Sequence, residues 1–144
     1  QVDQLAQNRS AEANVLIKKF WPAPLTLIFN AVPELPDILT ARTGKVGIRL
    51  PGNKWPRRLI EAVGCPLTAT SANISSEANP KTADEVEQAL GSKLDLIIDA
   101  GPAPGENFST LIDTTVSPPV LVRHGMVSQQ EIESSTKMEC TLIS

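Results

Sequence analysis

The sequence predicts an α/β fold, with a twisted sheet of mixed parallel and antiparallel strands and helices packed against it. Short apolar runs that are rich in β-branched residues are interleaved with segments of helical periodicity. Several of the expected strands are joined by short turns, whereas neighbouring parallel strands need long crossovers. At 144 residues the chain is long enough for a single domain with a buried core.

The first half of the chain begins with a helix. Apolar residues at helical spacing predict this helix over residues 3–20, and Pro22 with Pro24 ends it. The next run, 25–29, is apolar and β-rich and is expected to form a buried strand. The same criteria predict a loop or broken helix over 32–44, a strand over 46–50 and a helix over 55–63 that ends at Gly64.

The second half continues the alternation of strands and helices. Thr82 and Glu85 form a capping box that begins a helix. Strands are expected at 66–70, 94–99, 109–113 and 120–123, a polar loop at 74–81, a turn-rich loop at 101–105 and a short helix after Ser128. Residues 134–144 are weakly patterned and are expected to form a loosely structured tail, so that the ordered domain spans 1–133.

Composition excludes several classes of protein. Hydrophobic residues make up 41% and charged residues 20% of the chain, as in an ordinary globular protein. The apolar runs are far shorter than the ~20 residues that a membrane-spanning helix needs, and the first residues do not resemble a signal peptide. The two cysteines form no disulfide framework, and no Cys/His spacing indicates zinc. We therefore expect a cytoplasmic protein with no membrane partner and no metal-ligand cluster.

Basic and acidic residues lie in different parts of the chain, although the net charge is only −3. Residues 38–60 contain no acid, and residues 84–113 contain a single lysine among many acids. These stretches are either two solvated faces of opposite sign or, for the basic one, a surface that holds phosphate or an RNA backbone. The basic residues of the first stretch are Arg42, Lys45, Arg49, Lys54, Arg57 and Arg58.

Arg49 is the most specific candidate in the basic stretch. In a strand over 46–50, Gly47 and Arg49 share one face, and the glycine leaves room for a ligand beside the guanidinium group. A guanidinium group can bind a carboxylate or phosphate with two parallel hydrogen bonds; the alternative is an ordinary surface arginine. Ser71 and Asn73 follow the expected strand 66–70, either as an anion-binding turn or as a simple turn.

The sequence does not indicate a catalytic nucleophile. His124 is the only histidine and no Gly-x-Ser-x-Gly motif is present, so a Ser-His-Asp triad is not expected. Asp99 and Asp113 each end an expected strand, either as solvated carboxylates or as an acid/base pair. The chemistry that remains is the positioning and charge stabilisation of an anion.

Several short motifs in register resemble those of the YrdC-like family, the threonylcarbamoyl-AMP synthases of tRNA modification. They lie at 20–26, 46–51, 66–73, 96–101, 109–113 and 121–125, and read FWPAPLT, VGIRLP, PLTATSAN, LIIDAG, STLID and LVRHG. The resemblance implies a twisted, mixed α/β sheet with a positively charged groove.

The resemblance also implies a nucleotidyltransferase that joins L-threonine, bicarbonate and ATP, releases pyrophosphate and forms L-threonylcarbamoyl-AMP. Mg²⁺ would accompany the ATP, and a partner complex would transfer the threonylcarbamoyl group to position 37 of tRNA. By this resemblance Arg49, the Ala69 backbone and Ser109 would bind threonine. The residues expected to bind ATP are Lys45, Ser71, Asn73, Asn79 and Arg123.

The sequence departs from the family's pattern at its beginning. The family's Pro-Thr-x-Thr-x-Tyr-Gly and Lys-x-Arg motifs do not occur in it, and it contains no tyrosine. We therefore expect the C-terminal two-thirds of the family's domain, with an open sheet edge that leads to a dimer or to aggregation unless another segment covers it. Two alternative functions stay open: an RNA-binding module for tRNA or double-stranded RNA that uses the basic stretch, and the carbamoyl-adenylate-forming domain of hydrogenase maturation.

Overall fold

The computed structural model describes residues 1–74, 77–103 and 108–142. The chain forms two compact units, the first comprising residues 1–65 with 108–144 and the second comprising residues 66–107. The division arises because the described residues of the second unit contribute no strand to the sheet of the first.

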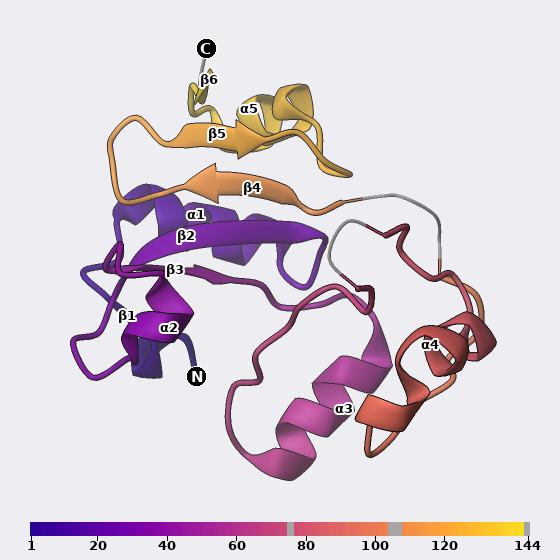
Figure 1. The fold of residues 1–144 in the computed structure, drawn as a ribbon. Helices are drawn as coiled ribbons and strands as arrows, with labels where there is room; N and C mark the ends of the chain where they lie inside the picture. Colours follow the sequence, from indigo (N-terminus) through magenta and orange to yellow (C-terminus); the bar gives the residue numbers. More distant parts are fainter. Residues whose placement is uncertain (75–76, 104–107, 143–144) are drawn as a thin grey trace. The chain divides into compact units, whose positions relative to one another are not determined.

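The first unit is built on a six-stranded mixed sheet (Figure 1). The central strand, β2, pairs with β3 along one edge, and with β4 and then β1 along the other edge. Strands β4 and β6 run parallel to β2 and β5, respectively, and the other pairs are antiparallel. The strands are β1 (Ala6–Gln7), β2 (Leu25–Ala31), β3 (Lys45–Ile48), β4 (Thr110–Asp113), β5 (Val120–Arg123) and β6 (Thr141–Leu142).

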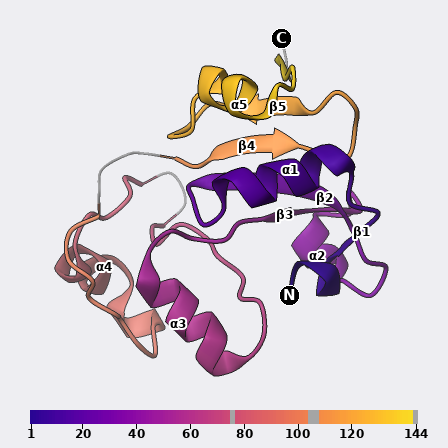
Figure 2. The same cartoon turned by 180° about the vertical axis from the view of Figure 1, so that it is seen from behind.

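One face of this sheet carries the core. Side chains of β2 alternate strictly between buried and half-buried positions, as expected for a strand with one covered face. Helices α1 (Ala11–Phe20) and α5 (Gln129–Thr136) cover the buried face and contact each other (Figure 2). The largest side chains of this core are Leu16, Leu25, Leu27, Phe29, Ile112, Leu121 and Ile132.

Helix α1 is shorter than the predicted helix over 3–20. Residues Val2–Gln4 form a single 3₁₀ turn, and Ala6–Gln7 form β1. Asn8 then adopts a left-handed conformation with φ 51°, which an α-helix cannot contain. Helix α1 therefore begins only at Ala11, where the Ser10 hydroxyl accepts a hydrogen bond from the Ala13 amide.

The region between β2 and the second unit matches its sequence prediction closely. The broken helix expected within 32–44 is the short α2 (Asp37–Thr40). The helix that was expected over 55–63 is α3 (Lys54–Val63), and Gly64 ends it with φ 78°, a conformation that glycine adopts without strain. None of the helices in the described part of the chain has the length and apolar character needed to cross a membrane.

The second unit contains α4 (Ala83–Leu90) and a 3₁₀ turn at Gly91–Lys93. The Thr82 hydroxyl accepts from the Glu85 amide as predicted, but the Glu85 carboxylate accepts from the amide of Lys81 and not from that of Thr82. The strands predicted at 66–70 and 94–99 are wrong, since neither segment has a paired neighbour among the described residues. Apolar side chains there stay exposed: Leu67 to 41%, Leu96 to 73% and Ile98 to 48%.

The C-terminal segment is more regular than the predicted loosely structured tail. Helix α5 continues to Thr136, and Thr141–Leu142 pairs with β5 as β6. Cys140 is buried in the core, and its carbonyl oxygen accepts a hydrogen bond from Gln129 Nε2. These contacts hold residues 134–142 against the sheet, which the weak sequence pattern does not reveal.

Candidate functional site

The candidate site lies on the face of the sheet opposite to α1 and α5. Thr26 and Ile28 of β2 point to this open face, and the register of β4 places Leu111 and Asp113 beside them. On the other side of β2, Lys45 and Gly47 of β3 share the same face. The open face therefore collects polar side chains from three neighbouring strands.

Ser109 is held at one end of the open face by two neighbours. Its hydroxyl oxygen lies 2.9 Å from Thr26 Oγ1 and accepts a hydrogen bond of 3.2 Å from Arg123 Nη2. The carbonyl oxygen of Ser109 accepts from both Nε and Nη2 of Arg123. The Arg123 guanidinium group also lies over the Phe108 ring, 5.5 Å from its centroid. Hydrogen bonding and stacking together fix this arginine beside the Ser109 hydroxyl.

Arg123 reaches the open face because the pairing of β4 and β5 is irregular. Leu121 pairs with Ile112, but the preceding residue of β4, Leu111, pairs with Arg123 instead of Val122. The extra residue in β5 is a β-bulge, and a bulge turns the following side chain to the opposite face. Without it, strict alternation would send Arg123 to the core side with Leu121.

A glycine allows the segment before β4 to pass close to the segment after β5. The Met126 amide donates to the Phe108 carbonyl, and the Thr110 hydroxyl exchanges hydrogen bonds with the backbone of Val127. A Cβ on Gly125 would lie 2.3 Å from the Thr110 nitrogen, so the backbones can approach this closely only with glycine there. This contact positions the peptide that carries Ser109.

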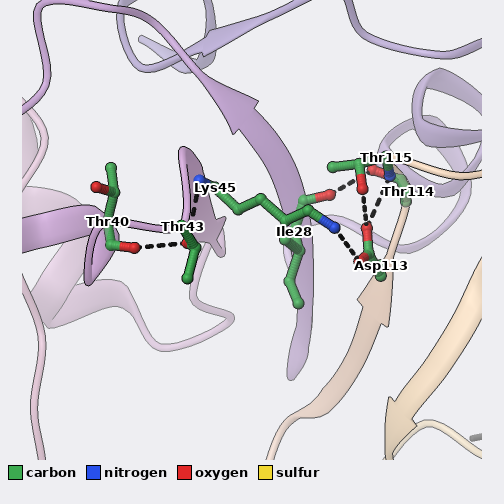
Figure 3. Close-up of polar contacts among 7 residues, drawn as sticks. All are labelled: Ile28, Thr40, Thr43, Lys45, Asp113, Thr114 and Thr115. Atoms are coloured by element: carbon green, nitrogen blue, oxygen red, sulfur yellow. Dashed lines mark hydrogen bonds and ion pairs between the residues drawn. The ribbon is translucent and has the colours of Figure 1, made fainter. Parts of the chain in front are cut away.

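A second polar cluster lies at the other end of the open face (Figure 3). The Lys45 side chain crosses over Ile28 of β2, and its Nζ lies 2.8 Å from Asp113 Oδ2. The other carboxylate oxygen, Asp113 Oδ1, accepts from both the amide and the hydroxyl of Thr115. Both oxygens of Asp113 are therefore satisfied, and Lys45 is held by a local partner.

These contacts shift the acidity of Asp113. Burial of the carboxyl group raises its pKa, but the hydrogen bonds from Lys45 and Thr115 and the lysine charge outweigh burial, so the pKa of Asp113 lies below its usual value. A lowered pKa in the folded state stabilises the fold above the unfolded-state pKa. That contribution is lost as the pH falls through the folded-state pKa.

We expect Lys45→Met to lower the free energy of unfolding by about 1 kcal/mol at neutral pH, because the side chains of the pair are 38% and 16% exposed. The loss should shrink as the pH falls through the lowered folded-state pKa of Asp113, because the protonated carboxyl group no longer pairs with the lysine charge. Urea unfolding at a series of pH values measures this loss of unfolding free energy. Lys18→Met is the control for removal of a surface lysine. A pH-independent loss would contradict a stabilising ion pair.

The predicted site residues of the first unit come close together only in part. Ser109 and Arg123 are in direct contact, although the resemblance assigns them to different ligands. Strand β3 ends at Ile48, so Arg49 lies one residue beyond the predicted strand and is exposed. The pairing of Leu27 with Ile48, extended by one step, leads to Thr26 and Arg49, and therefore to the Ser109 end of the open face.

Gly47 leaves room on this face, as the sequence predicts. A Cβ added there would lie 3.4 Å from the Thr26 methyl group. Thr26 and Phe108 were not predicted from the sequence as site residues. Thr26 lies between the buried residues Leu25 and Leu27, so it faces the other side of the sheet. A polar residue at this position of an apolar strand could have indicated a site residue.

The other predicted site residues belong to the second unit. Ala69 and Ser71 are exposed. Asn73 Nδ2 donates to the Glu77 carbonyl, and its Oδ1 is buried with no partner among the described residues. Asn73 and Asn79 line one open hollow of about 340 Å³ together with Glu77 and Glu85. The two carboxyl groups make this hollow better suited to hydroxyl or amino groups than to phosphate.

Other candidate groups do not assemble into a site. Asp99 Oδ1 accepts from the Gly101 amide in its own turn, while Asp113 belongs to the Lys45 cluster, so each carboxylate is satisfied locally. His124 is exposed beside Arg123. Within residues 1–74, 77–103 and 108–142, no three histidine, cysteine or acidic side chains gather as metal ligands. Part of the loop at 101–105 lies outside the described residues.

Known proteins resemble this chain over most of its length. A family model named Sua5_yciO_yrdC, described as "Telomere recombination", matches residues 1–125. The threonylcarbamoyl-AMP synthase of Pyrococcus abyssi is 38% identical over 133 residues, which cover 92% of this chain and 39% of that protein. The synthase of Schizosaccharomyces pombe is 37% identical over 124 residues, which cover 83% of this chain and 30% of that protein. The chain thus spans well under half the length of these relatives.

Solved structures resemble it in fold. The structure of P. abyssi Sua5 complexed with L-threonine matches with a TM-score of 0.92 and 36% identity, over 99% of this chain and 42% of that chain. Escherichia coli YciO matches with a TM-score of 0.78 and 28% identity, over 91% of this chain and 64% of that chain. The strand pairing and these solved structures therefore confirm the predicted mixed α/β sheet with flanking helices.

Proposed function

This chain belongs to the Sua5, YciO and YrdC family, and on that premise we propose that it takes part in forming L-threonylcarbamoyl-AMP from L-threonine, bicarbonate and ATP. The observation that carries the proposal is its likeness to P. abyssi Sua5, which was solved with L-threonine, over 99% of this chain. The names of the relatives support this reaction and support neither RNA binding alone nor carbamoyl-adenylate formation.

The reaction requires positioned anions and no protein nucleophile. The threonine amino group and bicarbonate combine into a carbamate with loss of one water molecule. A carbamate oxygen then displaces pyrophosphate from the α-phosphorus of ATP, which leaves threonylcarbamoyl-AMP. Both partners of the second step are anions, so donors and cations that hold them together supply the catalysis.

The polar groups of the chain divide between the two substrates in this proposal. Arg49 would bind the threonine carboxylate, and the Ala69 backbone and Ser109 would also bind threonine. Arg123 would act at the junction of the two substrates, because it already contacts Ser109 and presents a delocalised cation. The nucleotide would be bound by Lys45, Ser71, Asn73 and Asn79.

Magnesium enters this proposal only with the nucleotide. The described residues do not fit a protein-built site, because no three ligand side chains gather and both oxygens of Asp113 are taken by Lys45 and Thr115. Mg²⁺ is commonly held by nucleotide phosphates and water with few protein ligands. Transfer of the threonylcarbamoyl group to tRNA by a partner complex, and a cytoplasmic location, complete the proposed role.

Isotope exchange between ATP and pyrophosphate tests the proposal on the protein at its full genomic length. We expect labelled pyrophosphate to enter ATP only when both L-threonine and bicarbonate are present, because the adenylate forms reversibly from all three substrates. Reactions without threonine, and reactions without bicarbonate, are the controls. Absence of exchange in the complete mixture would reject the proposed function.

A further inference from the structure

Thr26 has a fixed orientation on the open face. Its methyl group faces β3, where a Cβ on Gly47 would lie 3.4 Å from it, and its hydroxyl faces Ser109 on the other side, at 2.9 Å. A β-branched side chain has few χ1 rotamers, so packing of the methyl group also directs the hydroxyl. Thr26 is half-buried and Ser109 is only 7% exposed, which keeps water from competing strongly for this bond.

The hydrogen-bond capacity of Ser109 limits what it can offer to a ligand. A hydroxyl group has one proton to donate and two lone pairs to accept with. Arg123 Nη2 can only donate, so it occupies one lone pair of Ser109 Oγ. If Thr26 donates its proton to the second lone pair, the Ser109 proton is left free to point away from both neighbours.

We propose that Thr26 is a positioning residue that makes Ser109 a hydrogen-bond donor toward an anionic oxygen of the bound amino acid. An oxygen that accepts two hydrogen bonds becomes a stronger donor through its own proton, and the nearby guanidinium charge also favours an anionic oxygen over an ammonium group. This inference rests on the proposed function, because the ligand is the threonine of that reaction.

Two substitutions separate the hydroxyl of Thr26 from its packing. Thr26→Val keeps the shape and the methyl contact beside Gly47 but removes the donor, so the KM for L-threonine in the exchange assay should rise roughly tenfold. Thr26→Ser keeps the hydroxyl and should return the KM close to that of the unaltered protein. Thr43→Val is the matched control, because its hydroxyl bonds only to the α2–β3 turn, at the Thr40 carbonyl and the Lys45 amide.

A double substitution tests whether Thr26 affects threonine binding through Ser109. In a protein that already carries Ser109→Ala, Thr26→Val should raise the threonine KM no further, since the residue through which it acts is gone. The preference for L-threonine over L-threonine amide, which lacks the carboxylate charge, should also narrow in Thr26→Val. Independent, additive effects of the two substitutions would overturn the proposal.

Failure of this inference differs from failure of the proposed function. If the unaltered protein shows threonine-dependent exchange and Thr26→Val lowers the melting temperature without changing the threonine KM, Thr26 has a packing role only and the inference is wrong. If the unaltered protein shows no exchange, titration calorimetry measures the Kd for L-threonine of the same variants, and this Kd is compared in place of the KM. Absence of threonine binding there would overturn the inference as well as the proposed function, which the missing exchange has already rejected.

Discussion

Gly125→Ala is expected to destabilise the first unit by about 3 kcal/mol or more, at the upper end of the cost of overpacking. The added Cβ would lie 2.3 Å from the Thr110 nitrogen, 2.5 Å from the Phe108 oxygen and 2.5 Å from the Ser109 carbonyl carbon. All three are backbone atoms, so no flexible side chain can move aside. The segment that precedes β4 and the segment that follows β5 must therefore move apart. This movement also weakens the hydrogen bond from the Met126 amide to the Phe108 carbonyl.

Urea unfolding followed by circular dichroism measures this effect. Gly52→Ala is the matched control, because its added Cβ would meet nothing nearer than the Pro22 oxygen at 3.9 Å. Since the same backbone carries Ser109, Gly125→Ala protein that remains folded at low temperature should also bind L-threonine more weakly. Equal stability of the two glycine variants would show that the two segments do not pass as closely as the structure describes.

The sequence predicted the strands that carry their own apolar alternation. Strands β2 and β4 each contain an alternating run, such as residues 25–29 of β2, whose buried positions can be predicted without knowledge of the partner strand. The segments 66–70 and 94–99 carry similar apolar runs, yet the described residues offer them no neighbouring strand. A strand needs hydrogen-bonded partner strands as well as an apolar pattern, and only the pattern is local to the segment.

The candidate site could be predicted only as separate residues. Arg49, Ser109 and Arg123 were each named from the sequence or its resemblance, but the β-bulge that turns Arg123 to the open face depends on the register between β4 and β5. The partnership of Lys45 with Asp113 likewise depends on two strands flanking β2. Which strands become neighbours, and where a bulge interrupts their pairing, are properties of the whole sheet and not of one segment.

Arg49→Ala is expected to weaken L-threonine binding by roughly tenfold to a hundredfold, which is the usual cost of losing a hydrogen-bonded charge partner. Arg49 is exposed immediately after β3, beside the room left by Gly47 and toward the Thr26–Ser109 end of the open face. The threonine carboxylate matches the two parallel donors of a guanidinium group. Arg49→Lys should recover only part of the affinity, because an ammonium group is a single point charge.

Titration calorimetry with L-threonine and, separately, with ATP measures whether the loss is specific. The ATP affinity should change much less than the threonine affinity, since Arg49 is not among the residues proposed to bind the nucleotide. Arg58→Ala on α3 is the matched control: it removes the same charge from the basic stretch, where the guanidinium group lies 5.5 Å from the Trp55 ring centroid. If Arg49→Ala reduces both affinities equally, or if Arg58→Ala matches it, the positive charge of the basic stretch acts as a whole and Arg49 has no individual role in holding the carboxylate.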